Sequence, residues 1–289
     1  MGKSRALTPG ASPDAHFGAE VRQAREAAGM TLQELGDLMP CDKSTVSRIE
    51  AGFTAPDEHF AKVCADTFGN PWFTRFWKDS RAWDALTPSL REFAIYEREA
   101  IVLWSLQHSL IPGLFQTEAY ARAVIEKHVD VTPEQVPERV RARMARQAVL
   151  DRETPPRFWA LIDEQVLYRE IAEPEVMADQ LRHLAELARR ATITVQVLPR
   201  KGAHIGLTGA FTAAQTADSL VVFKEDITDG TTTDAPAAAG LVITRFDVLR
   251  TEAYRGSESL EIIDKAAEAW AARLGGSPLT AVPAVTALR

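Results

Sequence analysis

The chain has 289 residues, of which 46% are hydrophobic and 25% are charged, and its formal net charge is −7. This length suffices for two ordinary domains. The negative charge excludes a protein that coats nucleic acid without selectivity, so any contact with DNA must come from a local surface. The sequence shows no run of 18 apolar residues and no secretory signal, so we expect a cytoplasmic protein without membrane contact.

Cys41 and Cys64 are the only cysteines of the sequence. Their spacing matches no metal-ligand pattern, so neither a disulfide framework nor a zinc site is expected. Free cysteines are usually buried, and we therefore predict reduced, buried thiols. No cofactor is expected either.

The first predicted helices follow a short arm. Residues 1–15 are rich in Gly, Pro and Ser and predict a disordered arm. Residues 17–72 then divide into helix-length pieces: "FGAEVRQAREAAG", "TLQELGDLM", "KSTVSRIEAG" and "PDEHFAKVCADTFG". Thr31 with Glu34 forms a capping box that begins the second piece, and glycines suited to a left-handed C-terminal residue end the others. These glycines are Gly29, Gly52 and Gly69.

Only "PCDK" separates the second and third helices, and such a short link forces the sharp angle of a helix-turn-helix. Gly36 in the second helix indicates close approach of the third. Asp42 is a candidate cap for the third helix, while Val46 and Ile49 turn inward. The outer face carries short polar side chains and two cations, which suit a DNA major groove. These residues are Lys43, Ser44, Thr45, Ser47 and Arg48.

"GMTLQELGDLM" and "STVSRIEAG" resemble the Cro/C1-type (XRE-family) helix-turn-helix over residues 17–72. The resemblance implies DNA binding by the outer face of the third helix, with Arg48 on a phosphate or a base. Leu32 occupies the position where this family often has a phosphate-binding glutamine, and Gln33 beside it is the candidate for that contact. Pro40 stands where the family usually has glycine, and proline cannot adopt a positive φ.

The predicted DNA-binding domain is acidic. From Phe17 to Gly69, five Lys and Arg residues are outnumbered by nine Asp and Glu residues, a net charge of −4. Phosphate neutralisation supplies most non-specific affinity, so one copy should bind DNA weakly, and a dimer or the basic arm would have to help. Arg22 or Arg25 is also a candidate to pair with Glu50 and fasten the first helix to the third. A helix-turn-helix that serves only protein contacts is the alternative.

The predicted linker and tail flank the second domain. Residues 73–89 predict a linker helix, preceded by Trp72, and aromatic side chains at four-residue spacing suggest packing or a domain joint. Residues 274–289 predict a disordered tail, because they carry two prolines and no charge before the last residue.

Residues 90–273 predict an α+β domain with a small sheet. Helical stretches at 117–128 and 133–151 precede "RFWALID" and "TITVQVLP", which have strand composition and enclose a helical segment. "GAFTAAQ" and "SLVVFKED" predict a hairpin, and helices return from about 235 to 273. The predicted fold is therefore a mainly α N-terminal helix-turn-helix domain plus an α+β C-terminal domain.

"LIPGLFQTEAYARA", "RVRARMARQAVLDR" and "TITVQVLPRKGAHIGLTGAF" resemble the C-terminal domain of actinomycete XRE-family regulators of the WhiJ-like, antitoxin-like class. The resemblance extends from about residue 90 to 273. Genes of this class commonly neighbour one for a small protein, so the resemblance implies regulation through a protein complex. It implies no established chemistry.

Three arginines of the second domain share one side of a predicted helix. They are interpreted as a solvated face or, alternatively, as a site for an anion or an acidic partner. These residues are Arg139, Arg143 and Arg146.

His204 in "KGAHIG", with Asp163 and Glu164 at a strand end, is the nearest approach to a catalytic group. A histidine in a Gly-rich loop is more often structural. The sequence contains no nucleophile elbow, H-E-x-x-H, phosphate-loop or dinucleotide motif, so we expect no catalytic residue and no enzyme.

The sequence thus predicts a transcriptional regulator that binds a double-stranded DNA operator as a homodimer. Its second domain would bind a small partner protein, encoded by a neighbouring gene, or a small-molecule effector. An antitoxin-like adaptor that mainly sequesters a small partner protein is the alternative.

Overall fold

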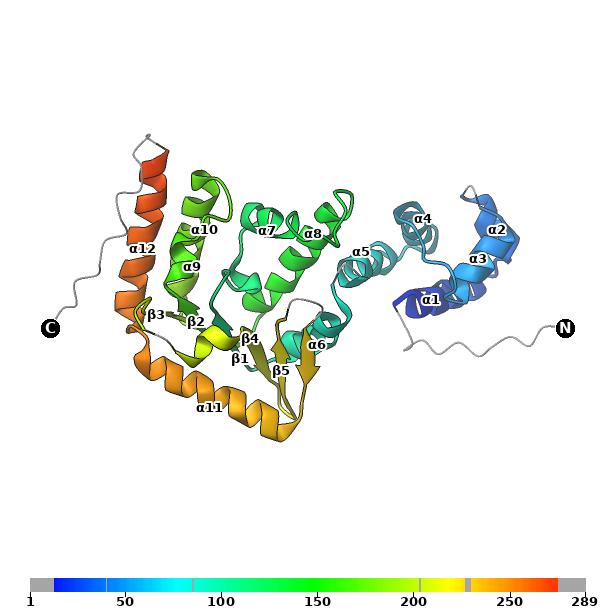
Figure 1. Ribbon diagram of the computed structural model, residues 1–289. Coiled ribbons are helices and arrows are strands. Elements are labelled where there is room, and N and C mark those ends of the chain that lie inside the picture. Colours follow the sequence, from blue (N-terminus) through cyan, green and yellow to red (C-terminus); the bar gives the residue numbers. More distant parts are fainter. Residues whose placement is uncertain (1–12, 40, 85, 203, 227–229, 275–289) are drawn as a thin grey trace. The chain divides into compact units, whose positions relative to one another are not determined.

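The computed structural model describes residues 13–39, 41–84, 86–202, 204–226 and 230–274. It divides the chain into two compact units, Met1–Asp84 and Ala85–Arg289, each with its own hydrophobic core (Figure 1). Most of the predicted arm, Pro40 and nearly all of the predicted tail lie outside the described residues.

Helices make up the N-terminal unit, and their ends follow local sequence signals. Thr31 Oγ1 accepts a hydrogen bond from Glu34 N at 3.2 Å, and Glu34 Oε2 accepts one from Thr31 N at 2.7 Å, which confirms the predicted capping box. The three glycines predicted to end helices all have positive φ. The helices are α1 (Pro13–Ala27), α2 (Leu32–Asp37), α3 (Lys43–Glu50), α4 (Glu58–Phe68) and α5 (Trp72–Asp84). The first turn of α1 therefore lies inside the segment 1–15 that was expected to be an arm.

One hydrophobic core joins these helices, and the aromatic residues of α5 belong to it. Phe17 from α1 and Phe73 from α5 are buried and meet edge to face, with ring centroids 5.6 Å apart. Trp72 and Phe76 stack at 4.5 Å and pack against this core. The aromatic spacing therefore serves packing, as expected. Both cysteines are free thiols: Cys64 is buried, whereas Cys41, also predicted to be buried, is only partly so.

The C-terminal unit is built on a six-stranded mixed sheet with the order β3-β2-β1-β4-β5-β6. The strands β1, β2 and β3 are parallel, and β4, β5 and β6 are antiparallel to their neighbours. The strands are β1 (Val102–Gln107), β2 (Arg157–Asp163), β3 (Ile193–Leu198), β4 (Phe211–Gln215), β5 (Leu220–Lys224) and β6 (Thr231–Thr233). The α+β class and the β4–β5 hairpin are confirmed.

Helices cover both faces of this sheet (Figure 1). Phe246 and Leu249 of α11 pack on the face that carries Leu161 and Phe211. α6, α7, α9, α10 and α12 contribute to the core on the opposite face, which carries Phe158, and α8 packs against α7 through Val136 and Val140. The helices are α6 (Pro88–Glu99), α7 (Glu118–Ile125), α8 (Val136–Arg146), α9 (Gln165–Tyr168), α10 (Pro174–Ala188), α11 (Pro236–Glu252) and α12 (Gly256–Arg273).

Three further expectations from the sequence differ from the structure. The single linker helix predicted for 73–89 is two helices, because α5 ends at Asp84 and α6 begins at Pro88. The helix predicted for 133–151 is α8 followed by a 3₁₀ turn over Gln147–Asp151. The sheet also contains β1 and β6, which the sequence did not predict, and β1 lies at its centre.

Candidate nucleic-acid interface

The helix α3 begins at the cap that the sequence predicted. Asp42 Oδ1 accepts hydrogen bonds from Ser44 Oγ at 2.7 Å and from Thr45 N at 2.8 Å. These bonds favour the ionised carboxylate, so the pKa of Asp42 lies below its ordinary value, with the Ser44 hydroxyl as the largest cause. The first turn of α3 is therefore fixed by its own side chains.

The outer face of α3 presents the predicted DNA-contacting residues. Lys43, Ser44, Ser47 and Arg48 are exposed, whereas Thr45 is only partly so. Val46 and Ile49 are buried in the core, as predicted. The polar face is thus held outward by the burial of the opposite face.

The sixth candidate lies on α2. Gln33 is exposed, and its Nε2 donates to Asp37 Oδ1 at 2.7 Å one turn along the same helix. Leu32 beside it is partly buried and packs against the core. The residue at the position where the Cro/C1-type resemblance implies a phosphate contact is therefore apolar and packs against the core, and Gln33 would have to leave Asp37 to reach a phosphate.

Glycines allow the close packing that positions α3. A Cβ on Gly36 of α2 would lie 2.9 Å from the carbonyl oxygen of Cys41 in the turn and 3.5 Å from Val46 Cγ2. A Cβ on Gly18 of α1 would lie 2.2 Å from the carbonyl oxygen of Ile49. Both glycines therefore stand where a larger residue would push α3 away.

A buried ion pair ties α1 to α3. Arg25 Nε and Nη2 donate to Glu50 Oε1 and Oε2 at 2.6 and 3.0 Å, and Nη1 donates to the carbonyl of Met30 at 2.8 Å. The Glu50 hydrogen bond is the largest cause of a raised pKa at Arg25. Arg22 instead pairs with Glu26 at 3.0 Å on the surface. Arg25 is thus a scaffold residue and is not available to DNA.

Phe53 is a neighbouring residue that the sequence reasoning did not single out. This residue is 69% exposed and lies three positions after Glu50, the last residue of α3. Gly52 before it has a φ of 70°, which turns the chain out of the helix. The signal in the sequence that could have identified Phe53 is its position as a large apolar residue directly after the glycine that follows a helix.

The C-terminal unit contains a partly open cavity of about 210 Å³ between one sheet face and α6, α8 and the loop before α7. Arg143 and Arg146 of α8 line it. Arg146 forms a bidentate pair with the buried Glu97 at 2.9 and 2.7 Å, and Arg143 Nη1 donates to Gln116 Oε1 at 2.8 Å. The interpretation of these arginines as a solvated face is therefore wrong: α8 turns them inward, because Glu97 and Gln116 supply partners there.

The third arginine of that set lies apart. Arg139 Nη2 lies 3.7 Å from Asp130 Oδ2, and Asp130 is largely exposed. Arg139 does not line the cavity.

His204 and Asp163, which the sequence grouped, do meet at the end of β2. His204 Nε2 lies 3.1 Å from Asp163 Oδ2, and both side chains are buried. Asp163 Oδ1 accepts from Gln165 N at 2.9 Å, and Glu164 Oε2 accepts from Arg200 N at 3.2 Å. All three side chains thereby fix loop geometry, which suits a structural role.

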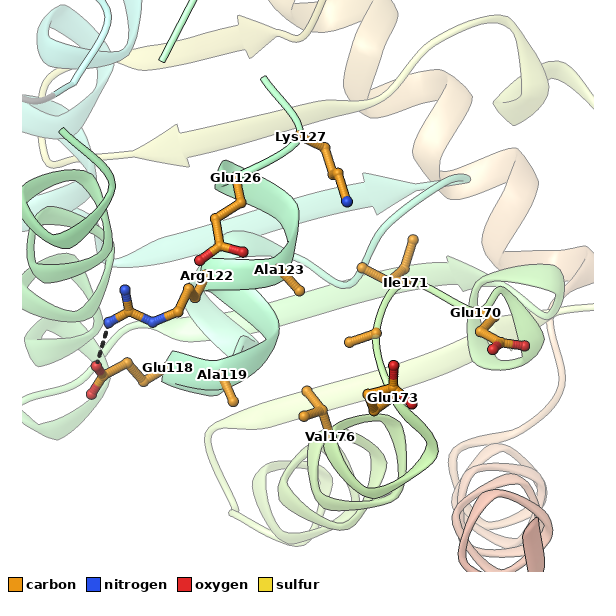
Figure 2. Close-up of a pocket in the computed structure, with 11 residues that line it drawn as sticks. Glu118, Ala119, Arg122, Ala123, Glu126, Lys127, Glu170, Ile171, Glu173 and Val176 are labelled. Atoms are coloured by element: carbon orange, nitrogen blue, oxygen red, sulfur yellow. Dashed lines mark hydrogen bonds and ion pairs between the residues drawn. The ribbon is translucent and has the colours of Figure 1, made fainter. Parts of the chain in front are cut away.

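An open groove of about 810 Å³ lies between α7 and the segment before α10. Figure 2 shows Glu118 paired with Arg122 along α7, while Glu170 and Glu173 come from the opposite wall. Acidic residues outnumber cations along it, and none of its described side chains has a buried polar atom without a partner.

A family model described as a domain of unknown function, DUF5753, matches residues 90–265, which is more than half of the chain. The chain belongs to the DUF5753 family. A second model, described as a helix-turn-helix domain, matches residues 16–71 and therefore covers α2 and α3. No curated protein and no solved structure gives a match.

These matches agree with the two units of the structure. The helix-turn-helix domain supports a DNA-binding transcriptional regulator, with α3 as its second helix. The DUF5753 region contains the cavity and the His204 loop. Among the described residues, no helix is long and apolar enough to cross a membrane.

Proposed function

We propose that this DUF5753 chain is a cytoplasmic, sequence-specific transcriptional regulator that contacts its operator through the outer face of α3. The observation that carries the proposal is the exposed, short polar face of α3, held by the Asp42 cap and by the buried Val46 and Ile49. Lys43, Ser44, Thr45 and Ser47 contact base edges, and Arg48 contacts a phosphate or a base. Gln33 on α2 contacts the backbone.

The acidity of the N-terminal unit supports binding as a homodimer. Its net charge from Phe17 to Gly69 is −4, and the ion pair with Glu50 removes Arg25 from the cations that DNA could attract. Two copies place two recognition helices about 34 Å apart, one turn of DNA. The C-terminal unit brings the copies together and responds to a small-molecule effector or a small partner protein, and it acts as a binding module rather than an enzyme.

The same acidity favours a second candidate, an antitoxin-like adaptor whose main role is to sequester a small partner protein. This adaptor would co-purify with the product of a neighbouring gene and give no sequence-specific footprint. A footprint that persists without the partner would exclude it.

The first test is selection of duplexes from a random pool by the full chain, followed by mobility shifts with the selected sequence. Lys43→Ala and Arg48→Ala should each weaken specific binding by about tenfold or more, since a contact of this kind contributes about 1–3 kcal/mol. Arg22→Ala removes the same charge from the exposed face of α1 and is the matched control. Unchanged binding in both α3 variants would contradict the assignment.

A further inference from the structure

The cavity of the C-terminal unit contains a cation that forms no ion pair with any described carboxylate. Arg146 is neutralised by Glu97 at 2.7 Å. Arg143, one turn earlier on α8, makes a hydrogen bond to the neutral Gln116, and no carboxylate of the described chain lies within ion-pair distance of it. Two guanidinium groups of the same helix thus line one cavity, and of these two only Arg146 forms an ion pair with a described carboxylate.

The charge of Arg143 is retained despite its surroundings. Burial lowers its pKa to about 10, so the side chain stays protonated at neutral pH. A charge removed from water without a partner is costly, and a bound anion would remove that cost.

A second polar group of the cavity also lacks a partner. Ser105 on the central strand β1 is 1% exposed, and its Oγ has no hydrogen-bond partner among the described residues. Ser105 lines the same cavity as Arg143. Buried hydroxyls are normally satisfied, so this Oγ is a donor available to a ligand.

Acidic groups at the cavity occupy its exposed side. Glu225 and Asp226 follow β5, and both are exposed to solvent. Glu225 Oε1 already accepts from Gln107 Nε2 at 2.9 Å. Glu225 acts on Arg143 at longer range and raises its pKa, but it forms no ion pair with Arg143.

The remaining walls favour a small ligand with an apolar body. Phe93 and Phe223 face one another with ring centroids 5.8 Å apart, and Phe158 and Leu110 add further apolar surface. A volume of 210 Å³ corresponds to roughly seven water molecules in the liquid. This is smaller than a typical drug-sized pocket.

We propose that this cavity is the effector site of the chain and that it binds a small organic anion, a carboxylate or a phosphate monoester with an apolar body. Arg143 binds the anionic group, Ser105 Oγ donates to it, and the aromatic wall contacts the apolar body. The site deepens the proposed function, and its effect on DNA binding rests on that function.

The test is isothermal titration calorimetry of the full chain with benzoate and with phenyl phosphate, using benzamide as the neutral probe. We expect saturable binding of at least one anion and no binding of benzamide. The anion that binds more tightly shows whether the site prefers a carboxylate or a phosphate group. No saturable heat with either anion up to about 10 mM, or equal binding of benzamide, would overturn the proposal.

Single substitutions distinguish a loss of anion binding from a loss of folding. Arg143→Met should weaken anion binding by about tenfold or more, and Arg143→Lys by less, because it keeps the charge but loses the planar fork. Ser105→Ala should weaken binding without loss of thermal stability, since the hydroxyl has no partner to lose. Arg139→Met on the same helix lies outside the cavity and should bind as the wild type does. Equal weakening by Arg139→Met, or none by Arg143→Met, would contradict the site.

Calorimetry without DNA separates this inference from the function on which it rests. If anion binding is observed but does not change the mobility shift of the selected duplex, the ligand site stands and its coupling to DNA is wrong. If the α3 variants leave DNA binding unchanged, the proposed function fails while the calorimetric result is unaffected.

Discussion

Both units of the chain contain a buried arginine–glutamate pair that joins two helices, and the surroundings of the two pairs differ. Arg25 joins Glu50 at 2.6 Å and connects α1 to α3 in the N-terminal unit. Arg146 joins Glu97 at 2.7 Å and connects α8 to α6 in the C-terminal unit. In the N-terminal unit Arg25 also donates to the carbonyl of Met30 and lies 3.5 Å from Glu26 Oε1. In the C-terminal unit a further arginine, Arg143, lies beside the pair, donates to the neutral Gln116 and forms no ion pair with a described carboxylate.

The comparison separates two uses of a buried cation. An arginine whose charge is matched by a buried carboxylate stabilises a helix contact and has little attraction left for an anionic ligand. An arginine held in a cavity by a neutral amide retains its attraction for an anion. The first type sets the orientation of α3, and the second belongs to a ligand site.

Breaking either pair should give the largest effect. Glu50→Ala and Glu97→Ala each leave a buried guanidinium without its partner, which costs about 3–5 kcal/mol of unfolding free energy. Denaturant unfolding of the full chain, followed by circular dichroism, measures the loss. Glu261→Ala on α12 is the control, since the Glu261 side chain is 71% exposed, its carboxylate lies 4.0 Å from Lys265 Nζ, and surface pairs contribute little. If both variants lose less than about 1 kcal/mol of unfolding free energy, the buried pairs stabilise the fold no more than surface pairs do.

A smaller effect on the unfolding free energy is expected for Arg143, which forms no ion pair with a described carboxylate. Arg143→Met loses the hydrogen bond to Gln116 but also relieves the desolvation that lowers the pKa of Arg143. These contributions oppose each other, so the unfolding free energy should change by less than about 1 kcal/mol in the absence of ligand. Arg146→Met, by contrast, strands the buried Glu97 and should cost several times more, about 3 kcal/mol or above. Equal losses in the two variants would show that Arg143 is a scaffold residue as well.

Features that depend on residues close together in the sequence could be predicted, whereas features that depend on residues far apart in the sequence could not. The capping box of Thr31 and Glu34, the Asp42 cap and the glycine helix ends depend on residues within one turn, and all were predicted. The strand β1 was missed because "VLWSLQ" follows a helical segment without a turn signal and pairs with β2, which lies about fifty residues away.

The cavity could not be predicted for the same reason. Arg143, Gln116 and Ser105 come from α8, a loop and β1, and only the folded sheet brings them together. A row of arginines on one helical side normally predicts a solvated face. Here Glu97, from a distant helix, compensates Arg146 and allows that side of α8 to turn inward.

The smallest expected effect concerns the exposed cap of α3, where no buried charge is involved. The pKa of Asp42 lies below its unfolded value, so its ionised form stabilises the fold. That stabilisation is fully present above the unfolded pKa of about 3.9 and is lost as the pH falls through the folded pKa. Asp42→Asn keeps an oxygen that can accept from Thr45 N but removes the titrating group. The variant should therefore lose less thermal stability between about pH 5 and pH 3 than the wild type does. If the two melting temperatures depend on pH in parallel, the charge of Asp42 does not contribute to the stability of the α3 cap. The electrostatic difference between the two units would then depend on their buried arginines alone.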